Sequence, residues 1–137
     1  MSVQEVHYAT VTEARKNFSA LIDAAEAGVP ATVQRDQRRS AVVDAERLRD
    51  FLVSVHPARA EVVAEGGGWS VLLTGLPVAA DGETFDGALD EMVSALREYA
   101  EDWADHLRQA PNHAHNWGLV QIIDLSSDEE LKDWLQR

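Results

Sequence analysis

The spacing of hydrophobic and polar positions predicts a strand and then a helix at the start of the chain. Residues 6–9 are predicted to form the strand, and Thr10 begins the helix because Thr10 and Glu13 have the spacing of a capping box. Gly28 ends this helix, since glycine adopts the left-handed terminal conformation without a steric penalty, and Pro30 prevents its continuation. The apolar face of the helix consists of Ala14, Phe18, Leu21, Ile22 and Ala25.

A hairpin and a second helix are predicted next. Two β-prone runs, 31–35 and 38–43, surround the polar turn Asp36-Gln37. Asp44 then caps a helix whose apolar face carries Leu48, Phe51, Leu52 and Val55. Residues 56–59 are predicted to be a linker, because the residue before a proline is disfavoured in the helical region. The expected first domain is therefore 1–57, with the order β-α-β-β-α.

The second half begins again with strands and continues into a long helix. Runs 61–65 and 69–73, joined by glycines, predict a hairpin, and 75–80 predicts a third, irregular strand before the turn Asp81-Gly82. Thr84 caps a helix that keeps the apolar helical period for about six turns, until Pro111. Its apolar positions are Phe85, Leu89, Met92, Val93, Leu96, Tyr99, Ala100, Trp103 and Leu107.

The last segment is predicted to contain one strand and one helix. The apolar run 117–125 is predicted to be the strand. Ser127 and Glu130 have capping-box spacing and begin a short helix with Leu131, Trp134 and Leu135 apolar. The expected second domain is 60–137, with the order β-β-β-α-β-α, and the expected fold class is α/β (α+β).

Charge is divided unevenly between the two halves. Residues 1–57 carry seven Lys/Arg and eight Asp/Glu, a net of −1, whereas residues 58–137 carry five and sixteen, a net of −11. The first half can present cations to a phosphate backbone. The second half is expected to repel nucleic acid and to attract a basic partner.

Composition excludes several classes of protein. The absence of cysteine excludes disulfides, thiolate zinc sites and cysteine nucleophiles. No apolar run approaches the roughly 18 residues that span a bilayer, and the first ten residues do not resemble a secretory signal. The sequence has no phosphate-binding glycine loop, no G-x-S-x-G elbow and no H-E-x-x-H motif. We therefore expect a cytoplasmic protein that is not an enzyme.

Residues 12–52 resemble the Phd/YefM family of antitoxins. The features that carry the resemblance are E-A-R-x-N-F-x-x-L-I from Glu13, E-A-G-x-P from Glu26, a hairpin ending in two aliphatic residues and a short helix. The family's hairpin turn usually contains a glycine, where this chain has Asp36-Gln37. The resemblance implies a homodimer, or a higher oligomer, whose first helix enters DNA grooves at a palindromic operator.

Residues 62–101 resemble a HicB-type antitoxin domain. The carrying features are G-G-W-S-V at 67–71, G-L-P at 75–77 and D-G-E-T-F-D-G-A-L-D at 81–90, followed by the long amphipathic helix. The family's small aromatic-cysteine segment after G-L-P is here Val78-Ala79-Ala80. This resemblance implies a degenerate α/β domain of the ribonuclease-H-like type.

Two groups of residues are candidates for DNA binding. Cations bind phosphate oxygens, and arginine or asparagine can also hydrogen-bond base edges. The first group, at the start of the first helix, is Thr10, Thr12, Arg15, Lys16 and Asn17, and the second, in the hairpin, is Arg35, Arg38 and Arg39. The alternatives are an ordinary solvated helix start and a charged hairpin tip.

The acidic half suggests a surface for a basic toxin, and the resemblances imply a RelE-like or related endoribonuclease. In the final helix Leu131, Trp134 and Leu135 lie among carboxylates, a pattern that fits an anchor inserted into a partner's groove. The alternative is that these three side chains pack on the domain's own sheet.

No metal, cofactor or catalytic residue is expected. His106, His113 and His115 lack the defined spacing of a metal site. Four aspartates raise the idea of a two-metal nuclease, the least favoured hypothesis: Asp81, Asp86, Asp90 and Asp124. The expected function is a type II antitoxin that neutralises its toxin by direct binding and represses its own operon. The alternative is an acidic, oligomeric protein-interaction module without DNA binding.

Overall fold

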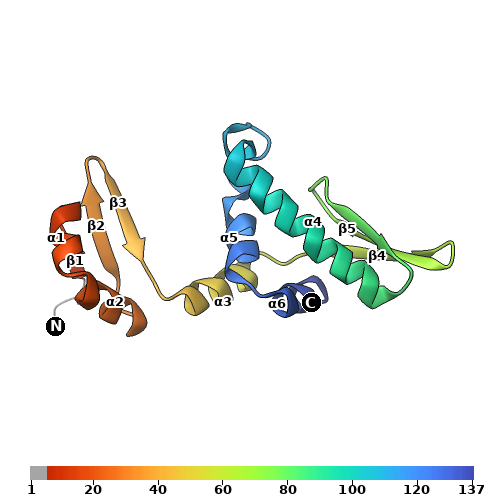
Figure 1. Cartoon of the computed structure of the whole chain (residues 1–137), viewed down its shortest axis with the longest axis horizontal. Helices are drawn as coiled ribbons and strands as arrows, with labels where there is room; N and C mark the ends of the chain where they lie inside the picture. The colour runs from red at the N-terminus through yellow and green to blue at the C-terminus, as the bar shows by residue number, and fades with distance from the viewer. Residues whose placement is uncertain (1–5) are drawn as a thin grey trace. The chain divides into compact units, whose positions relative to one another are not determined.

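The computed structural model describes residues 6–137 and has an α+β fold (Figure 1). The described residues form two three-stranded sheets and six α-helices. The chain divides into two compact units between Leu48 and Arg49, whereas the predicted boundary lies at 57–60. No helix in the described part is long and apolar enough to cross a membrane.

The first unit is a small sheet with two short helices. It contains β1 (Val6–Tyr8), α1 (Val11–Lys16), α2 (Phe18–Glu26), β2 (Ala31–Arg35), β3 (Arg38–Val42) and the start of α3 (Ala45–Val55). The strand order is β1-β2-β3, with β1 parallel and β3 antiparallel to β2. Ala14, Leu21 and Ala31 form a thin buried core.

The predicted first helix is interrupted at Asn17, which separates α1 from α2. The Asn17 N–H is shared between the carbonyls of Glu13 and Ala14, and its side-chain amide donates to the Glu13 carbonyl at 2.9 Å. Asparagine side chains compete in this way for backbone groups, which makes asparagine a poor residue for a helix interior. One continuous helix was therefore the wrong prediction.

The predicted caps and turns of this unit are confirmed. The Thr10 hydroxyl accepts the Glu13 N–H at 3.1 Å, while the Glu13 carboxylate reaches back one residue further than expected, to the Ala9 N–H. Gly28 has the left-handed φ of +82°. Asp36 supplies the positive φ, 53°, that the family's turn usually obtains from glycine, so the hairpin closes in two residues.

The second unit places one long helix against a sheet. After the rest of α3 it contains β4 (Ala60–Glu65), β5 (Gly68–Leu73), β6 (Ala79–Gly82), α4 (Phe85–Asp105), η1 (Leu107–Gln109), η2 (Ala114–Asn116), α5 (Trp117–Leu125) and α6 (Asp128–Leu135). The antiparallel order is β4-β5-β6, and α4 lies against β5 and β6. The third strand lies later than predicted, so Asp81 and Gly82 belong to it and do not form a separate turn.

The predicted strand at 117–125 is wrong, because these residues form α5. A nine-residue apolar run with Val120, Ile122 and Ile123 satisfies either pattern, and its β-branched residues favoured a strand. The buried positions are Leu119, Val120, Ile122 and Ile123, which share one side of a helix, and α5 packs against α4. The expected β-β-β-α-β order is therefore not the observed one.

The apolar face predicted for α3 is also partly wrong. Phe51 and Val55 are 61% and 60% exposed, and the buried residues in this part of α3 are Arg49, Leu52 and Val53. These three positions are related by i, i+3 and i+4, so they lie on one side of the helix. An arginine thus occupies the inward face, where the periodicity predicted only hydrophobic residues.

The contact of β6 with α4 requires glycine at position 82. A Cβ at Gly82 would lie 2.4 Å from the Ala88 nitrogen and 2.8 Å from its Cα, both rigid backbone atoms. We expect Gly82→Ala to destabilise the protein by about 1–3 kcal/mol, because overpacking forces backbone shifts. Urea unfolding followed by circular dichroism measures this change.

Gly118→Ala is the matched control for Gly82→Ala. A Cβ at Gly118 meets only the His56 Cδ2, at an ordinary 3.9 Å, and alanine is favoured over glycine inside a helix. Its stability is expected to be unchanged or slightly higher. Equal losses for the two variants would contradict a specific close approach at Gly82.

Candidate functional site

The first candidate DNA-binding group lies along α1 and is only partly available. Thr12, Arg15 and Lys16 are exposed, whereas the Thr10 hydroxyl is engaged as the helix cap. The Asn17 amide donates to the Glu13 carbonyl. The two cations are therefore the members of this group with free polar heads, since neither makes an ion pair in the described part of the chain.

The second candidate group forms the tip of the β2–β3 hairpin. Arg35 and Arg38 face each other across the strands, and Arg39 faces Gln34. All three arginines are exposed. Like charges directly opposite each other destabilise a strand pair. The hairpin thus carries a local cost in charge repulsion, and an anion bound at the tip would relieve it.

Both groups lie at the same end of the first unit. Because β1 runs parallel to β2 and Tyr8 is aligned with Val33, the chain leaves β1 on the side of the hairpin tip. Figure 1 shows α1 at this end, beside β2. The start of α1 and the hairpin tip, about twenty residues apart in the sequence, therefore lie at the same end of the unit, and Arg15 and Lys16 follow in the last turn of α1.

The three candidate toxin-binding residues lie in the core of the second unit. Leu131, Trp134 and Leu135 are 0%, 2% and 4% exposed. The Trp134 indole N–H donates to the His56 carbonyl at 2.9 Å. A toxin could contact these side chains only if α6 moved away from the unit, so in this fold they do not form a surface anchor.

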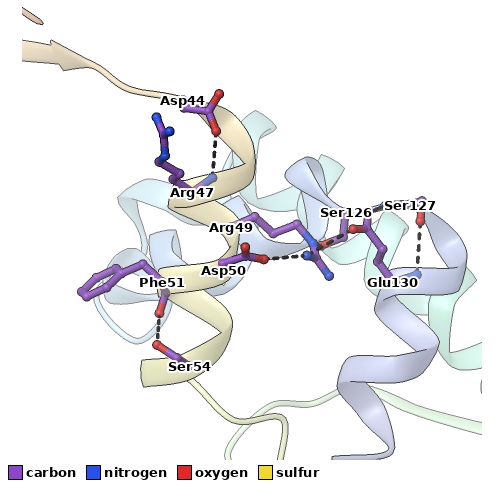
Figure 2. A network of polar contacts seen from close by, with 9 residues as sticks. All are labelled: Asp44, Arg47, Arg49, Asp50, Phe51, Ser54, Ser126, Ser127 and Glu130. Atoms are coloured by element: carbon purple, nitrogen blue, oxygen red, sulfur yellow. Dashed lines mark hydrogen bonds and ion pairs between the residues drawn. The ribbon is translucent and has the colours of Figure 1, made fainter. Parts of the chain in front are cut away.

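A buried arginine holds the start of α6, a role that sequence reasoning missed. Arg49 donates through Nε to the Ser126 hydroxyl at 2.9 Å, and its Nη1 lies 3.1 Å from Glu130 and 3.3 Å from Asp50 (Figure 2). Glu130 also accepts the Ser127 N–H at 2.9 Å, which completes the predicted capping box. The signal in the sequence that could have revealed this role is the position of Arg49, three residues before Leu52 and so on the same side of the helix as that buried residue.

A further arginine, Arg97 of α4, contacts the end of α5 and the start of α6. Arg97 donates to the carbonyls of Ile123 and Ser126 and pairs with Asp128 at 2.8 Å. The last carbonyls of a helix lack the N–H of a following turn, and Arg97 supplies donors to them; the Ile123 carbonyl also accepts the Ser126 N–H at 3.4 Å. They are structural contacts, and they leave the second unit with few cations free to offset its carboxylates.

Three of the four aspartates considered for a nuclease site hold structural contacts instead. Lys132 lies 2.8 Å from Asp90 and 2.9 Å from Asp86, and these contacts raise the pKa of Lys132 above its ordinary value of 10.5. Asp81 accepts the Ser70 hydroxyl at 2.6 Å. Within residues 6–137 no group of three or more histidines and carboxylates could hold a metal ion. His113 lies in a network with Tyr99.

The sequence match decides the family. Residues 5–136 match the PHD-like family, described as the antitoxin of a RelE/RelB toxin-antitoxin system. The chain belongs to this antitoxin family. The match spans both compact units, and a cognate toxin is therefore the partner of this antitoxin. Because the family is non-enzymatic, the expectation that the chain is not an enzyme is confirmed.

A solved structure shares the fold of this antitoxin. It is a protein from Syntrophomonas wolfei subsp. wolfei, described as the antitoxin part of a proposed toxin/antitoxin system. The TM-score is 0.78, with 96% of this chain and 95% of that chain covered, at 24% sequence identity. The sequence matches none of the curated proteins.

The capping box of Ser127 and Glu130 is expected to make the stability of the antitoxin vary with pH in the acid range. The Ser127 N–H, and next the charge of Arg49, hold the pKa of Glu130 below its ordinary value of 4.5. A lowered folded-state pKa contributes stability that is complete above the unfolded pKa and is lost as the pH falls through the folded one. We therefore expect Glu130→Gln to lower the unfolding temperature at neutral pH, with the two proteins converging below pH 4.5.

Thermal unfolding of both proteins across the acid range tests this expectation. Glutamine keeps the length and an acceptor oxygen of glutamate, so the comparison isolates the charge. A difference in unfolding temperature that stays constant as the pH falls would show that the ionised carboxylate does not supply the effect.

Proposed function

We propose that this antitoxin binds operator DNA as a homodimer and represses its own operon, while it neutralises a RelE-like endoribonuclease by direct binding. DNA binding is assigned to residues 1–57 and toxin binding to residues 60–137. The resemblance of residues 62–101 to a HicB-type domain belongs to this proposal, as a description of the toxin-binding half. Inhibition is steric and electrostatic, without chemistry.

The observation that carries the DNA-binding part is the basic end of the first unit. Four exposed cations there make no ion pair within the described residues, in a chain of net charge −12: Arg15, Lys16, Arg35 and Arg38. Exposed carboxylates are abundant among residues 6–137, yet none of these pairs with the four side chains. Unpaired cations on one end of a small unit are the footprint of phosphate binding.

Exposed apolar residues in the same unit support the homodimer. Val11, Phe18 and Val43 are 42%, 57% and 47% exposed, in a unit of fewer than 50 residues with a thin core. Units of this size bury too little apolar surface to be very stable alone. A two-fold dimer would cover such residues and present two copies of the basic end to a palindromic site.

An acidic stripe on α4 supports the toxin-binding part. We define it as five exposed carboxylates along the outer side of the helix: Glu91, Glu98, Glu101, Asp102 and Asp105. Several are related by i+3 or i+4, spacings at which like charges repel each other. In the described chain no lysine or arginine pairs with them, and the one basic side chain beside them is the imidazole of His106, 3.1 Å from Asp105. A basic toxin surface would relieve this repulsion and be steered toward the stripe.

The test is copurification of the full-length antitoxin with the product of its neighbouring open reading frame, followed by titration of the complex with promoter DNA. We expect a stable complex that weakens as salt is raised, and specific binding of the promoter fragment. A complex without DNA binding would leave the alternative of an acidic interaction module. Absence of a complex with any neighbouring product would overturn the proposed toxin-binding half.

A further inference from the structure

Strand β4 is an exposed edge of the second sheet. The order β4-β5-β6 leaves one side of β4 without a strand partner among the described residues. Such an edge carries a row of backbone N–H and C=O groups that can pair with another chain. Val62 and Val63, at the centre of β4, are 39% and 40% exposed, so the edge is both apolar and available.

The helix of this unit does not cover β4. Val62 is aligned with the buried Val71, so it points to the face of the sheet on which α4 lies, yet it remains partly exposed. On the opposite face, Val63 and the 41% exposed Leu72 are diagonal neighbours across β4 and β5. Natural edge strands of this length are usually protected. This one has apolar residues on both of its faces.

We propose that β4 pairs antiparallel with β4 of a second copy of this chain, with Val62 opposite Val62 of the second copy. Val62 lies at the middle of residues 60–64, which begin and end with the small residues Ala60 and Ala64. In this register Ala60 faces Ala64 of the second copy and Glu61 faces Val63 of the second copy. The two three-stranded sheets then join into one continuous sheet.

The two-fold symmetry of such a pair restricts the register. Residues that face each other across antiparallel strands point to the same side of the sheet, so only slides of two residues keep α4 of both copies on one face. Sliding in one direction places Glu61 against Glu61 of the second copy. Sliding in the other direction places Glu61 against Glu65 of the second copy. Both neighbouring registers therefore set like charges opposite each other.

The proposed register instead creates opposite-charge pairs. It brings Arg59, the residue before β4, next to the end of the strand that carries Glu65 of the second copy, and the two-fold axis repeats this pair. Arg59 has a left-handed φ of 52°, so the extended backbone ends there and the long side chain makes the pair. Arg59 is exposed and makes no ion pair in the described part of the chain, although its unit contains 17 carboxylates. The Thr74 hydroxyl donates to the Arg59 carbonyl at 3.3 Å and holds this residue at the end of the hairpin. Charge complementarity therefore favours a second copy as the occupant of the edge.

Disulfide trapping in the full-length protein tests the register directly, because the chain has no cysteine of its own. In antiparallel strands, facing Cα atoms are about 4.5–5.5 Å apart, within the range that a disulfide spans. We expect Val62→Cys to form a disulfide-linked dimer under mild oxidation. Ala60→Cys or Ala64→Cys alone should not, since identical residues would lie about 13 Å apart. An equal mixture of these two variants should cross-link.

A charge swap provides the second measurement. Arg59→Glu and Glu65→Arg are each expected to slow the trapping of Val62→Cys by roughly 2- to 30-fold, because two ion pairs become two like-charge contacts. The double reversal should restore the rate. If either single reversal slows trapping and the double variant does not restore the rate, the proposed register is overturned.

The remaining outcomes of the trapping experiment also decide whether the proposal holds. Equal trapping at all three cysteine positions would mean that the disulfides form by random collision. If the thiol of Val62→Cys stays free, the β4 edge faces a strand of the toxin or solvent and not a second copy. Either outcome would overturn the proposal. Toxin and DNA binding of the same variants are measured separately. Loss of either binding with register-specific trapping intact would count against the proposed function alone.

Discussion

Trp134→Ala is expected to lower the free energy of unfolding of this antitoxin by about 3–5 kcal/mol, the usual cost of removing a buried tryptophan. The side chain is 2% exposed, and its indole N–H satisfies the His56 carbonyl. The substitution therefore opens a cavity and leaves a backbone acceptor without its partner. Urea unfolding followed by far-ultraviolet circular dichroism measures the loss without relying on tryptophan fluorescence.

Trp117→Ala is the matched control, because Trp117 is 55% exposed at the start of α5. Its effect should stay within about 0.5 kcal/mol, as for most surface substitutions. The pair also tests where toxin contact lies. A Trp134→Ala protein of unchanged stability that no longer bound the toxin would show that α6 is an external anchor and would contradict its buried position.

Removal of Arg15 and Lys16 together is expected to weaken DNA binding across sequences and to flatten its dependence on salt. Each phosphate contact contributes about 0.9 to the slope of log affinity against log salt. A symmetric dimer that loses two contacts in each copy should therefore lose about three to four units of slope. Fluorescence anisotropy of a labelled promoter fragment, titrated at several salt concentrations, measures both quantities.

The matched control is Arg108→Ala combined with Arg137→Ala. It removes the same number of positive charges, but from the second unit. Both arginines are exposed, and neither makes an ion pair in the described residues. This control should leave the slope unchanged if the basic end of the first unit binds the phosphates. Equal flattening by the two double variants would show that net charge alone accounts for the effect. An unchanged affinity for Arg15→Ala with Lys16→Ala would refute the assigned DNA surface.

The local signals of this chain were sufficient for most of its elements. The caps at Thr10, Asp44, Thr84 and Ser127 all hold the N–H groups that their spacing predicted, because capping depends on residues only two or three positions apart. The two hairpins and the long α4 followed from turn residues and periodicity in the same way. The antitoxin family was also recognisable from the motifs between Glu13 and Pro30.

By itself, then, the sequence determined the elements, the separation of charge and the antitoxin family, because these depend on neighbouring residues and on composition. Only the tertiary structure decided that 117–125 is a helix, since an apolar run of this length suits either element until its packing partner is known. It also decided that Leu131 and Trp134 face inward, and that Arg49 is buried against Glu130. Each of these depends on contacts between residues distant in sequence, which local spacing does not encode.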